Sequence, residues 1–307
     1  MSTADSNATS ANRNLIYDVG MHKGEDTAYY LEKGFQVVAF EADPGLVAAA
    51  RSAFKDAIAE QRLVLVEGVI TEASLLGEPG RTATFYRNDA LSVWGTAEEA
   101  FAERSRQDGY KITQVDVAVV DLRGTLKTYG VPYYMKIDIE GMDWVCLEAL
   151  AALETSPAYV SIESEKESFG RLVAEIETLE KLGYTSYQAV QQFLIPGRHA
   201  PVPSSEGVSC AYCFPDNASG VFGGDLPADA WLGKEEIINR YYDIFLMYRR
   251  FGDHSLIGRY AWSRNLTYSL SRLLRRPLPG WYDTHARHQS FAQQQHATTD
   301  TQTGEAS

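Results

Sequence analysis

The sequence predicts an α/β fold: a mostly parallel sheet with helices on both faces, an antiparallel last strand and a C-terminal helical appendage. Short apolar runs alternate with stretches of helical periodicity along most of the chain, which is typical of βα units with parallel strands. The 307 residues are 45% hydrophobic and 22% charged, as expected for one large globular domain with an appendage.

The first half of the chain alternates strands with helices that have recognisable ends. Gly34 ends the first helix, and Pro44 stands near the first turn of the second. We expect strands at Leu15–Val19, Gln36–Phe40, Leu63–Val66, Thr82–Arg87 and Val115–Val120, and helices at Glu25–Lys33 and Pro44–Phe54. Parallel pairing is favoured here because parallel strands need a crossover between them.

The second half continues the alternation and then becomes helical. We expect strands at Tyr133–Ile137, Tyr159–Ile162, Thr185–Val190 and Val208–Phe214, and helices at Trp144–Leu153, Arg171–Leu182, Lys234–Arg250 and Ser263–Arg276. The last two strands are expected to pair antiparallel. A Gly-rich linker, Ser219–Leu226, leads into the C-terminal helices.

Composition divides the chain into four parts. Residues 1–13 and 288–307 are polar and low in large apolar side chains, so both ends are predicted to be disordered. Residues 14–227 form the predicted main domain. Residues 228–287 form a helical extension that is too small for a core of its own and is expected to pack on the main domain.

Charge and cysteine content exclude several classes of protein. The formal net charge of -13 disfavours binding to nucleic acid, and no apolar run is long enough to span a bilayer. Three cysteines make no disulfide framework and the N-terminus has no apolar signal region, so we expect a cytoplasmic protein. The arginine-rich C-terminal helices either bind an anionic substrate, carrier or membrane surface, or form a solvated face. A homo-oligomer is compatible with the sequence.

The segment IYDVGMHKGEDT, residues 16–27, indicates a ligand-binding loop. A strand runs through Asp18 into Gly20 and Gly24, whose glycines permit close backbone approach to a ligand. The next strand ends at Glu41, and an acid in that place can accept both ribose hydroxyls of an adenosine. The alternative is that the two glycines only make a tight turn, with helix-capping residues after it.

The charges of this loop favour S-adenosylmethionine over a dinucleotide. Asp18, Glu25 and Asp26 would repel a pyrophosphate, whereas S-adenosylmethionine carries an ammonium and a sulfonium group. The role of Lys23 is left open, since its ammonium can bind either a phosphate or the carboxylate of the methionine part. A nicotinamide-dependent oxidoreductase and a non-catalytic binding protein remain as alternatives; the first lacks the strict glycine spacing.

The sequence resembles the FkbM family of methyltransferases from about residue 15 to 227. The matching pieces are IYDVGMHKGEDT at 16–27, VVAFEADP at 37–44, FYRN and LSVWGT within 85–96, YMKIDIEGMDWVCLEAL at 134–150 and SGVFGGDLP at 219–227. The resemblance implies a class I methyltransferase fold, which is Rossmann-like. It also implies S-adenosylmethionine-dependent O-methylation of a small molecule or carbohydrate: a sugar, glycolipid, polysaccharide or secondary metabolite.

The resemblance also implies roles for single residues. Asp18, Gly20 and Gly24 match positions that contact the methionine part of the cofactor, and Glu41 matches the ribose-binding acid. The residues Met21-His22-Lys23 differ from the small neutral ones usual in that loop. The full set assigned to the cofactor is Asp18, Gly20, Gly24, Thr27, Glu41, Ala42, Gly68 and Asp138.

The candidate catalytic residues are Asp138, Glu140 and His22. Alternation along an extended segment places the two acids on the same side, just past an apolar strand. Methylation of an alcohol benefits from a general base or a cation, so either acid can be the base, or both can hold Mg²⁺. The alternatives are that the acids cap the next helix and order the loop without chemistry, and that His22 is a solvent-exposed loop residue. Lys136, inside the strand, is interpreted as structural.

Three other groups of residues are candidates for a functional role, and no residue is assigned to a metal. Asp283 and His285 lie near aromatic residues and would suit a sugar-binding surface. The single C-x-x-C pair, Cys210 and Cys213, is too few ligands for structural zinc and favours core packing. Trp94 either stacks on the cofactor or substrate, or packs in the core.

Overall fold

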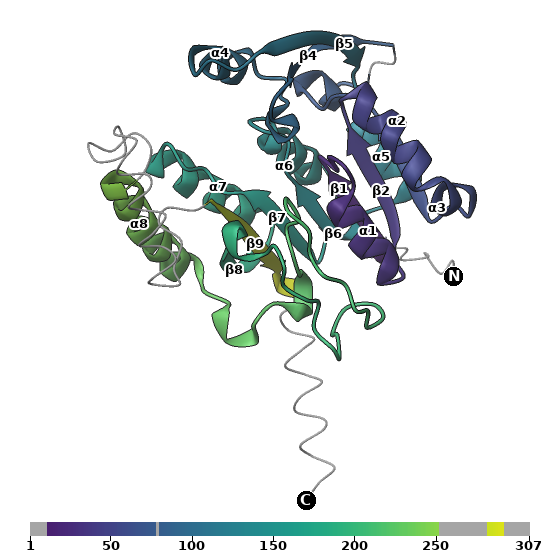
Figure 1. Ribbon diagram of the computed structural model, residues 1–307. Helices are drawn as coiled ribbons and strands as arrows, with labels where there is room; N and C mark the ends of the chain where they lie inside the picture. Colours follow the sequence, from purple (N-terminus) through teal and green to yellow (C-terminus); the bar gives the residue numbers. More distant parts are fainter. Residues whose placement is uncertain (1–10, 78–79, 252–280, 292–307) are drawn as a thin grey trace, which may run out of the picture. The chain divides into compact units, whose positions relative to one another are not determined.

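The computed structural model describes residues 11–77, 80–251 and 281–291 (Figure 1). It contains two compact units, residues 1–160 and 161–307. The predicted helix Ser263–Arg276 and most of the two predicted disordered ends lie outside the described residues.

The sheet of the first unit has four parallel strands in the order β3-β2-β1-β6. They are β1 (Asn12–Val19), β2 (Gln36–Glu41), β3 (Leu63–Glu67) and β6 (Pro132–Ile137). All four were predicted to within three residues at each end, because each is an apolar run bounded by polar or turn residues.

The register of these strands aligns their carboxyl ends. Val19 at the end of β1 pairs with Phe40 of β2 and with Ile137 of β6, and Phe40 pairs with Val66 of β3. The loops that follow the strands therefore emerge at one edge, where ligands bind in open α/β sheets.

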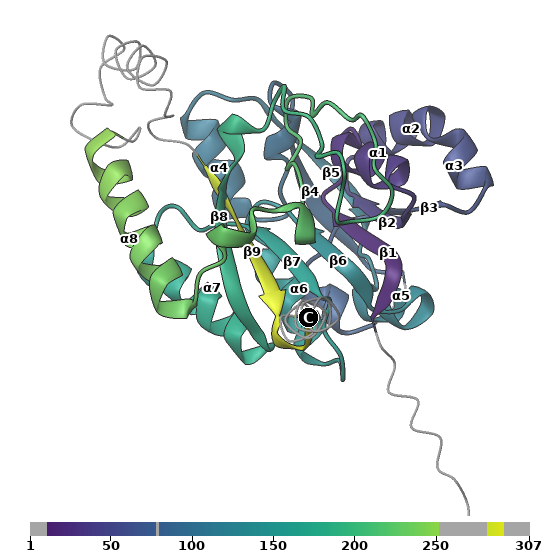
Figure 2. The ribbon, with the colours of Figure 1, turned by 90° about the horizontal axis from the view of Figure 1, so that it is seen from below.

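Helices cover both faces of this sheet (Figure 2). The helices α1 (Glu25–Glu32), α2 (Pro44–Ala53) and α3 (Lys55–Ala59) lie on one face. The helices α5 (Leu122–Tyr129) and α6 (Asp143–Ala151) lie on the other. Right-handed crossovers require this division, because the chain moves outward from β1 to β3 and then returns to β6.

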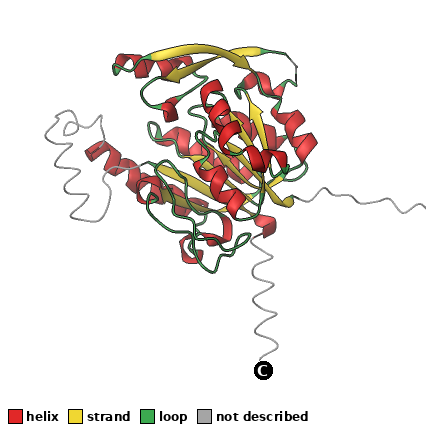
Figure 3. Cartoon of the chain, turned by 45° about the vertical axis from the view of Figure 1, so that its right-hand side comes forward, coloured by secondary structure: helices red, strands yellow, loops and turns green. Residues whose placement is uncertain are grey.

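A separate two-stranded sheet is inserted between β3 and α5 (Figures 1 and 3). It pairs β4 (Thr82–Asn88) antiparallel with β5 (Ile112–Ala118), and α4 (Glu99–Gln107) lies between them in sequence. Phe85 and Val117 pack with Val69 in a small core of their own. The end of β4 leads directly into the candidate site.

The second unit contains α7 (Phe169–Lys181), β8 (Tyr184–Gln191), α8 (Lys234–Phe251) and β9 (Tyr282–His288). The strand β9 pairs antiparallel with β8. The predicted strand Val208–Phe214 is wrong: this segment is largely exposed and makes only an isolated bridge through Cys213. The strand β9 was not predicted, because the sequence YDTHARH has no apolar alternation and its buried positions include Asp283, Thr284 and His285.

The complete strand order is β3-β2-β1-β6-β7-β9-β8 in a seven-stranded sheet, where β7 is Tyr159–Glu163. This is the mostly parallel Rossmann-like arrangement with an antiparallel last strand that the sequence predicts. Short 3-10 helices complete the fold: η1 (Glu72–Leu75), η2 (Ser92–Trp94), η3 (Gln192–Leu194), η4 (Gly223–Asp225) and η5 (Ala228–Ala230). No helix among the described residues is long and apolar enough to cross a membrane.

Candidate functional site

The loop after β1 is held against the ends of β2 and β6. Gly20 and Met21 donate backbone hydrogen bonds of 3.1 and 2.9 Å to the carbonyl of Phe40. Gly20 has φ +85, and a Cβ there would lie 1.9 Å from the Asp138 carbonyl oxygen. Only glycine permits this approach, which brings the first loop and the end of β6 together.

The second glycine of the loop begins α1. Gly24 is the N-cap residue, with φ +88 in the left-handed region and no side chain to cap the helix. A Cβ there would lie 2.5 Å from the Phe54 ring. Both glycines therefore make the tight turn of the alternative interpretation. Their contact with the cofactor stays a prediction, and this turn is compatible with it.

Three carboxylates surround one buried ammonium beneath this loop. The Nζ of Lys136 lies 3.6 Å from an oxygen of each of Asp18, Asp26 and Asp138, and it donates a hydrogen bond of 3.2 Å to the Gly20 carbonyl. Lys136, Asp18 and Asp26 are buried, whereas the Asp138 side chain is 40% exposed. One positive charge among three negative ones leaves an excess of negative charge at the glycine loop.

The Asp18 carboxylate is the deepest group of this cluster. Its Oδ2 accepts a hydrogen bond of 2.6 Å from the Thr27 hydroxyl, and both residues have 0% exposure. Its Oδ1 has no hydrogen-bond donor among the described residues and only the 3.6 Å ion pair with Lys136. Buried carboxylate oxygens favour cationic partners, so this atom adds to the preference for a positive ligand.

Glu41, at the end of β2, binds backbone rather than standing free. Its carboxylate accepts hydrogen bonds from the N–H groups of His22 (2.9 Å), Ala42 (2.9 Å) and Asp43 (2.8 Å). The residue is 8% exposed, and burial raises its pKa to about 7 despite these bonds. A carboxylate accepts about four hydrogen bonds. The three used here leave room for one ribose hydroxyl unless a backbone bond is exchanged.

His22 bridges two side chains from different segments. Its Nδ1 lies 3.0 Å from Glu25 Oε1, and its Nε2 lies 2.8 Å from Ser92 Oγ. The His22 and Glu25 side chains are 13% and 12% exposed, so His22 is not the solvent-exposed loop residue of the alternative interpretation. Burial acts to raise the pKa of Glu25, but the hydrogen bonds from His22 and from backbone N–H groups outweigh it and hold the pKa below its usual value.

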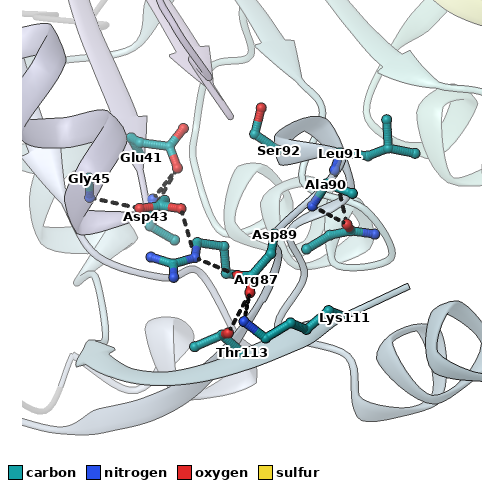
Figure 4. Close-up of polar contacts among 12 residues, drawn as sticks. Glu41, Asp43, Gly45, Arg87, Asp89, Ala90, Leu91, Ser92, Lys111 and Thr113 are labelled. Carbon is teal, nitrogen blue, oxygen red and sulfur yellow. Dashed lines mark hydrogen bonds and ion pairs between the residues drawn. The ribbon is translucent and has the colours of Figure 1, made fainter. Parts of the chain in front are cut away.

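The loop that presents Ser92 is fixed by the end of β4 (Figure 4). The Oδ1 of Asn88 accepts hydrogen bonds of 3.0 and 2.9 Å from the N–H groups of Ala90 and Leu91. The Nε of Arg87 lies 3.3 Å from Asp89 Oδ1. This turn places Ser92 at the start of η2, within reach of the first loop.

A charged chain continues from this turn to the end of β2 and to β5 (Figure 4). Arg87 Nε lies 3.9 Å from Asp43 Oδ2, and Asp43 in turn accepts the N–H of Gly45 at the start of α2. Asp89 Oδ2 accepts hydrogen bonds from Lys111 (2.8 Å) and Thr113 (3.0 Å). The loop is thereby tied to both sheets of the first unit.

The two acids after β6 stand in a turn, so the alternation argument for them is wrong. The strand ends at Ile137, and Glu140 has a left-handed φ of +45. Asp138 and Glu140 nevertheless offer oxygen atoms within 4.8 Å of one another. Neither acid is the N-cap residue of α6, which is Met142, and the alternative that the two acids order the loop without chemistry stays a prediction.

This turn is also bonded to the segment that carries Ser92. The hydroxyl of Thr96 donates a hydrogen bond of 2.7 Å to the Glu140 carbonyl. Asp143 Oδ1 accepts the N–H of Ile139 at 3.1 Å. The segments after β1, β2, β4 and β6 therefore meet beyond the carboxyl ends of β1, β2 and β6.

The other assigned residues near this edge have structural partners. Gly68 donates to the Glu41 carbonyl at 2.9 Å, and a Cβ at Gly68 would lie 2.5 Å from the Ala118 carbonyl oxygen. Trp94 packs edge to face on Tyr110, with ring centroids 5.3 Å apart. The predicted cofactor roles of Gly68 and Ala42 stay predictions.

In the second unit, Asp283 and His285 are buried in β9 instead of forming a sugar-binding surface. Burial lowers the pKa of His285 to about 3. Cys210 is partly buried and Cys213 is exposed, which does not support the core packing predicted for Cys213.

Sequence reasoning missed Ser92 and Asn88 as parts of the site, and it missed the contact of Glu25 with His22. The motif FYRN…LSVWGT contained Ser92 and Asn88, but the contacts of the site join residues up to 70 positions apart. No periodicity within the chain carries that information.

Comparisons with known proteins identify a family. The family model described as "Methyltransferase FkbM domain" matches residues 18–186. No curated protein sequence matches the chain.

Several solved structures are similar to the chain at low identity. Precorrin-6y C5,15-methyltransferase from Geobacter metallireducens is 15% identical, with 59% of this chain and 71% of that one covered and a TM-score of 0.31. YcgJ from Bacillus subtilis is 10% identical, with 92% and 95% covered and a TM-score of 0.34. A SAM-dependent methyltransferase from Thiobacillus denitrificans, in complex with S-adenosyl-L-homocysteine, is 10% identical, with 91% and 86% covered and a TM-score of 0.33.

Proposed function

The chain belongs to the FkbM family of S-adenosylmethionine-dependent methyltransferases, and from this premise we propose that it methylates a hydroxyl oxygen of a small molecule or carbohydrate. The acceptor classes are those expected from the sequence: a sugar, glycolipid, polysaccharide or secondary metabolite. When bound, S-adenosylmethionine supplies a methyl group on a positively charged sulfur.

The observation that carries the proposed cofactor site is the excess of buried negative charge at the glycine loop. Asp18, Asp26 and Asp138 surround the Lys136 ammonium, and Asp18 Oδ1 accepts no hydrogen bond from the residues that the structure describes. A cationic ligand relieves this imbalance, whereas a pyrophosphate would add to it. Gly20 permits backbone approach to the methionine part beside this cluster.

Glu41 is the proposed ribose ligand. It stands at the end of β2, where the ribose of an adenosine ligand lies in Rossmann-like folds. One acceptor position on Oε2 is available for a hydroxyl, and the bond from the His22 N–H is the one that a second hydroxyl would replace. Ribose binding is therefore coupled to the conformation of the first loop.

The acceptor hydroxyl is expected to lie near Asp138, Glu140 and His22. An alcohol becomes a better nucleophile when a base removes its proton in the transition state. Asp138 and Glu140 also form a pair of hard oxygen ligands that suits Mg²⁺, the second means of lowering the pKa of the acceptor. Much of the acceleration would come from positioning the two reactants.

Calorimetry with S-adenosylhomocysteine tests the cofactor site. Asp18→Asn removes one buried negative charge and is expected to weaken binding at least about tenfold, or 1.4 kcal/mol. Asp56→Asn, on the exposed side of α3, is the matched control and should bind like the wild type. Unchanged affinity in Asp18→Asn, or binding of NAD in place of S-adenosylhomocysteine, would contradict the assignment.

The acceptor is sought with a methyl-transfer assay. Isotope-labelled S-adenosylmethionine is offered with a panel of sugars, glycolipids and secondary metabolites, with and without chelator. Label recovered in a methyl ether supports O-methylation, and a labelled methyl group on nitrogen or carbon contradicts it. Loss of transfer with chelator that Mg²⁺ restores supports the metal route, and full activity with chelator excludes it.

A further inference from the structure

Three side chains of the first unit form a continuous hydrogen-bonded line. Glu25 Oε1 lies 3.0 Å from His22 Nδ1, and His22 Nε2 lies 2.8 Å from Ser92 Oγ. Both distances are those of good hydrogen bonds. A carboxylate on one imidazole nitrogen and a hydroxyl on the other is the arrangement by which enzymes move a proton from a hydroxyl group.

Each member of this line is held in place by backbone contacts. His22 has φ +54, and its N–H donates to Glu41 Oε2 at 2.9 Å, which fixes a left-handed residue in the loop. Glu25 Oε2 accepts the Lys23 N–H at 3.1 Å. Asn88 holds the turn that precedes Ser92. A strained loop residue and a side chain from 70 positions away are thus brought together by independent anchors.

We propose that Glu25, His22 and Ser92 form a proton relay for the methyl acceptor, with Ser92 as its outer end; this rests on the proposed function. The acceptor hydroxyl gives its proton to Ser92 Oγ as Ser92 passes its own proton to His22 Nε2. The acceptor oxygen forms the new C–O bond while the C–S bond breaks and its electron pair stays on sulfur. The imidazolium that results is stabilised by Glu25, which acts as a positioning residue.

The surroundings favour this relay over the acids after β6. Asp138 already lies 3.6 Å from the Lys136 ammonium, so its carboxylate is engaged in an ion pair. His22 is instead paired with the Glu25 carboxylate. Glu25 favours a proton on Nδ1, which leaves the Nε2 lone pair to accept from Ser92. Imidazole is also the side chain that exchanges a proton most readily near neutral pH.

The tautomer of His22 tests the relay without any acceptor. The full chain is labelled with ¹⁵N-histidine and bound to S-adenosylhomocysteine, and the His22 signals are identified by their loss in His22→Asn. The relay requires a proton on Nδ1 and none on Nε2 in the neutral ring. Glu25→Gln should shift the population toward the other tautomer, whereas Glu32→Gln, exposed at the far end of α1, should not. A protonated Nε2 in the wild type would overturn the proposal.

Kinetics with the acceptor found in the panel provide the second test. His22→Asn should lower kcat by about 100-fold or more, the usual contribution of a general base. Ser92→Ala should lower kcat with little change in KM, and Ser92→Thr, which keeps the hydroxyl, should restore most of it. Glu25→Gln should shift the acidic limb of the pH profile. Full activity of Ser92→Ala would overturn the relay.

Calorimetry separates failure of the relay from failure of the proposed function. Ser92→Ala changes a side chain outside the first loop, so it should bind S-adenosylhomocysteine within about twofold of the wild type, because the cationic ligand is held by the Asp18 cluster. Loss of binding together with activity in Ser92→Ala would make the line a structural support of the loop and overturn the relay. A wild-type chain that does not bind S-adenosylhomocysteine would contradict the proposed function itself.

Discussion

At Glu41 a carboxylate is 8% exposed beside three backbone N–H donors, and burial raises its pKa to about 7 from its ordinary value of 4.5. Between these two pH values the folded chain holds a proton that the unfolded chain has lost. Stability from this group is therefore complete below pH 4.5 and falls as the pH rises toward 7. The residue proposed to bind ribose is thus sensitive to pH in the range where the enzyme would work.

Glu41→Gln should remove this part of the pH dependence. Between pH 5 and pH 8 the free energy of unfolding of the wild type should fall relative to that of the variant, by at most on the order of 3 kcal/mol. Urea denaturation at intervals of one pH unit measures the difference, with Glu32→Gln as an exposed control. Parallel curves for Glu41→Gln and wild type would show that Glu41 is ionised throughout.

At the scale of secondary-structure elements, Gly20 determines how close the first loop lies to the end of β6. Gly20 and Gly109 share a positive φ, +85 and +91, but a Cβ at Gly20 would meet the Asp138 carbonyl at 1.9 Å and one at Gly109 would meet nothing within 4 Å. Gly109→Ala therefore measures the cost of the left-handed backbone alone, about 1–2 kcal/mol. The additional loss of stability in Gly20→Ala measures the cost of separating the first loop from the end of β6.

Gly20→Ala should lose clearly more stability than Gly109→Ala and should also weaken S-adenosylhomocysteine binding, because the loop must move away from Asp138. Urea denaturation and calorimetry on both variants measure the two effects. Equal destabilisation by the two substitutions would contradict the close packing of this loop. Destabilisation of Gly20→Ala with unchanged affinity would separate the loop position from the cofactor site.

Helices and strands were predictable from the sequence where the hydrophobicity of the side chains changed clearly along the chain. The strands of the first unit are apolar runs, and the ends of β1 and β2 carry the predicted Asp18 and Glu41. In contrast, α4 was missed because it buries only Ala102 and Ser105, which form no apolar stripe. The strand β9 was missed because its buried side chains are largely polar.

The candidate site was predictable only in part, for a related reason. Glycines and acids at strand ends are local signals, so the cofactor loop was found. The partner of His22 is Ser92, and that pairing depends on the fold of the β4–β5 sheet and of the turn held by Asn88. Such a contact follows from tertiary structure and not from spacing.

At the scale of the whole molecule, the free energy of unfolding depends on pH through two buried groups, one in each unit, and their effects have opposite signs. Glu41 in the first unit is less stabilising as the pH rises, whereas His285 in the second has its pKa lowered by burial from 6.5 to about 3. For His285 the unfolded chain binds the proton more readily. Its contribution is complete above pH 6.5 and is lost as the pH falls through that value toward 3.

Mild acid should therefore weaken the second unit before the first. Between pH 7 and pH 4, burial of neutral His285 should reduce stability by on the order of 3 kcal/mol, a loss that His285→Gln should largely lack and that the exposed control His199→Gln should retain. Hydrogen exchange locates the effect: amides of β8 and β9 should lose protection at a higher pH than those of β1 and β2. Simultaneous loss of protection in all four strands, unchanged by His285→Gln, would mean that this histidine does not determine the acid stability of the chain.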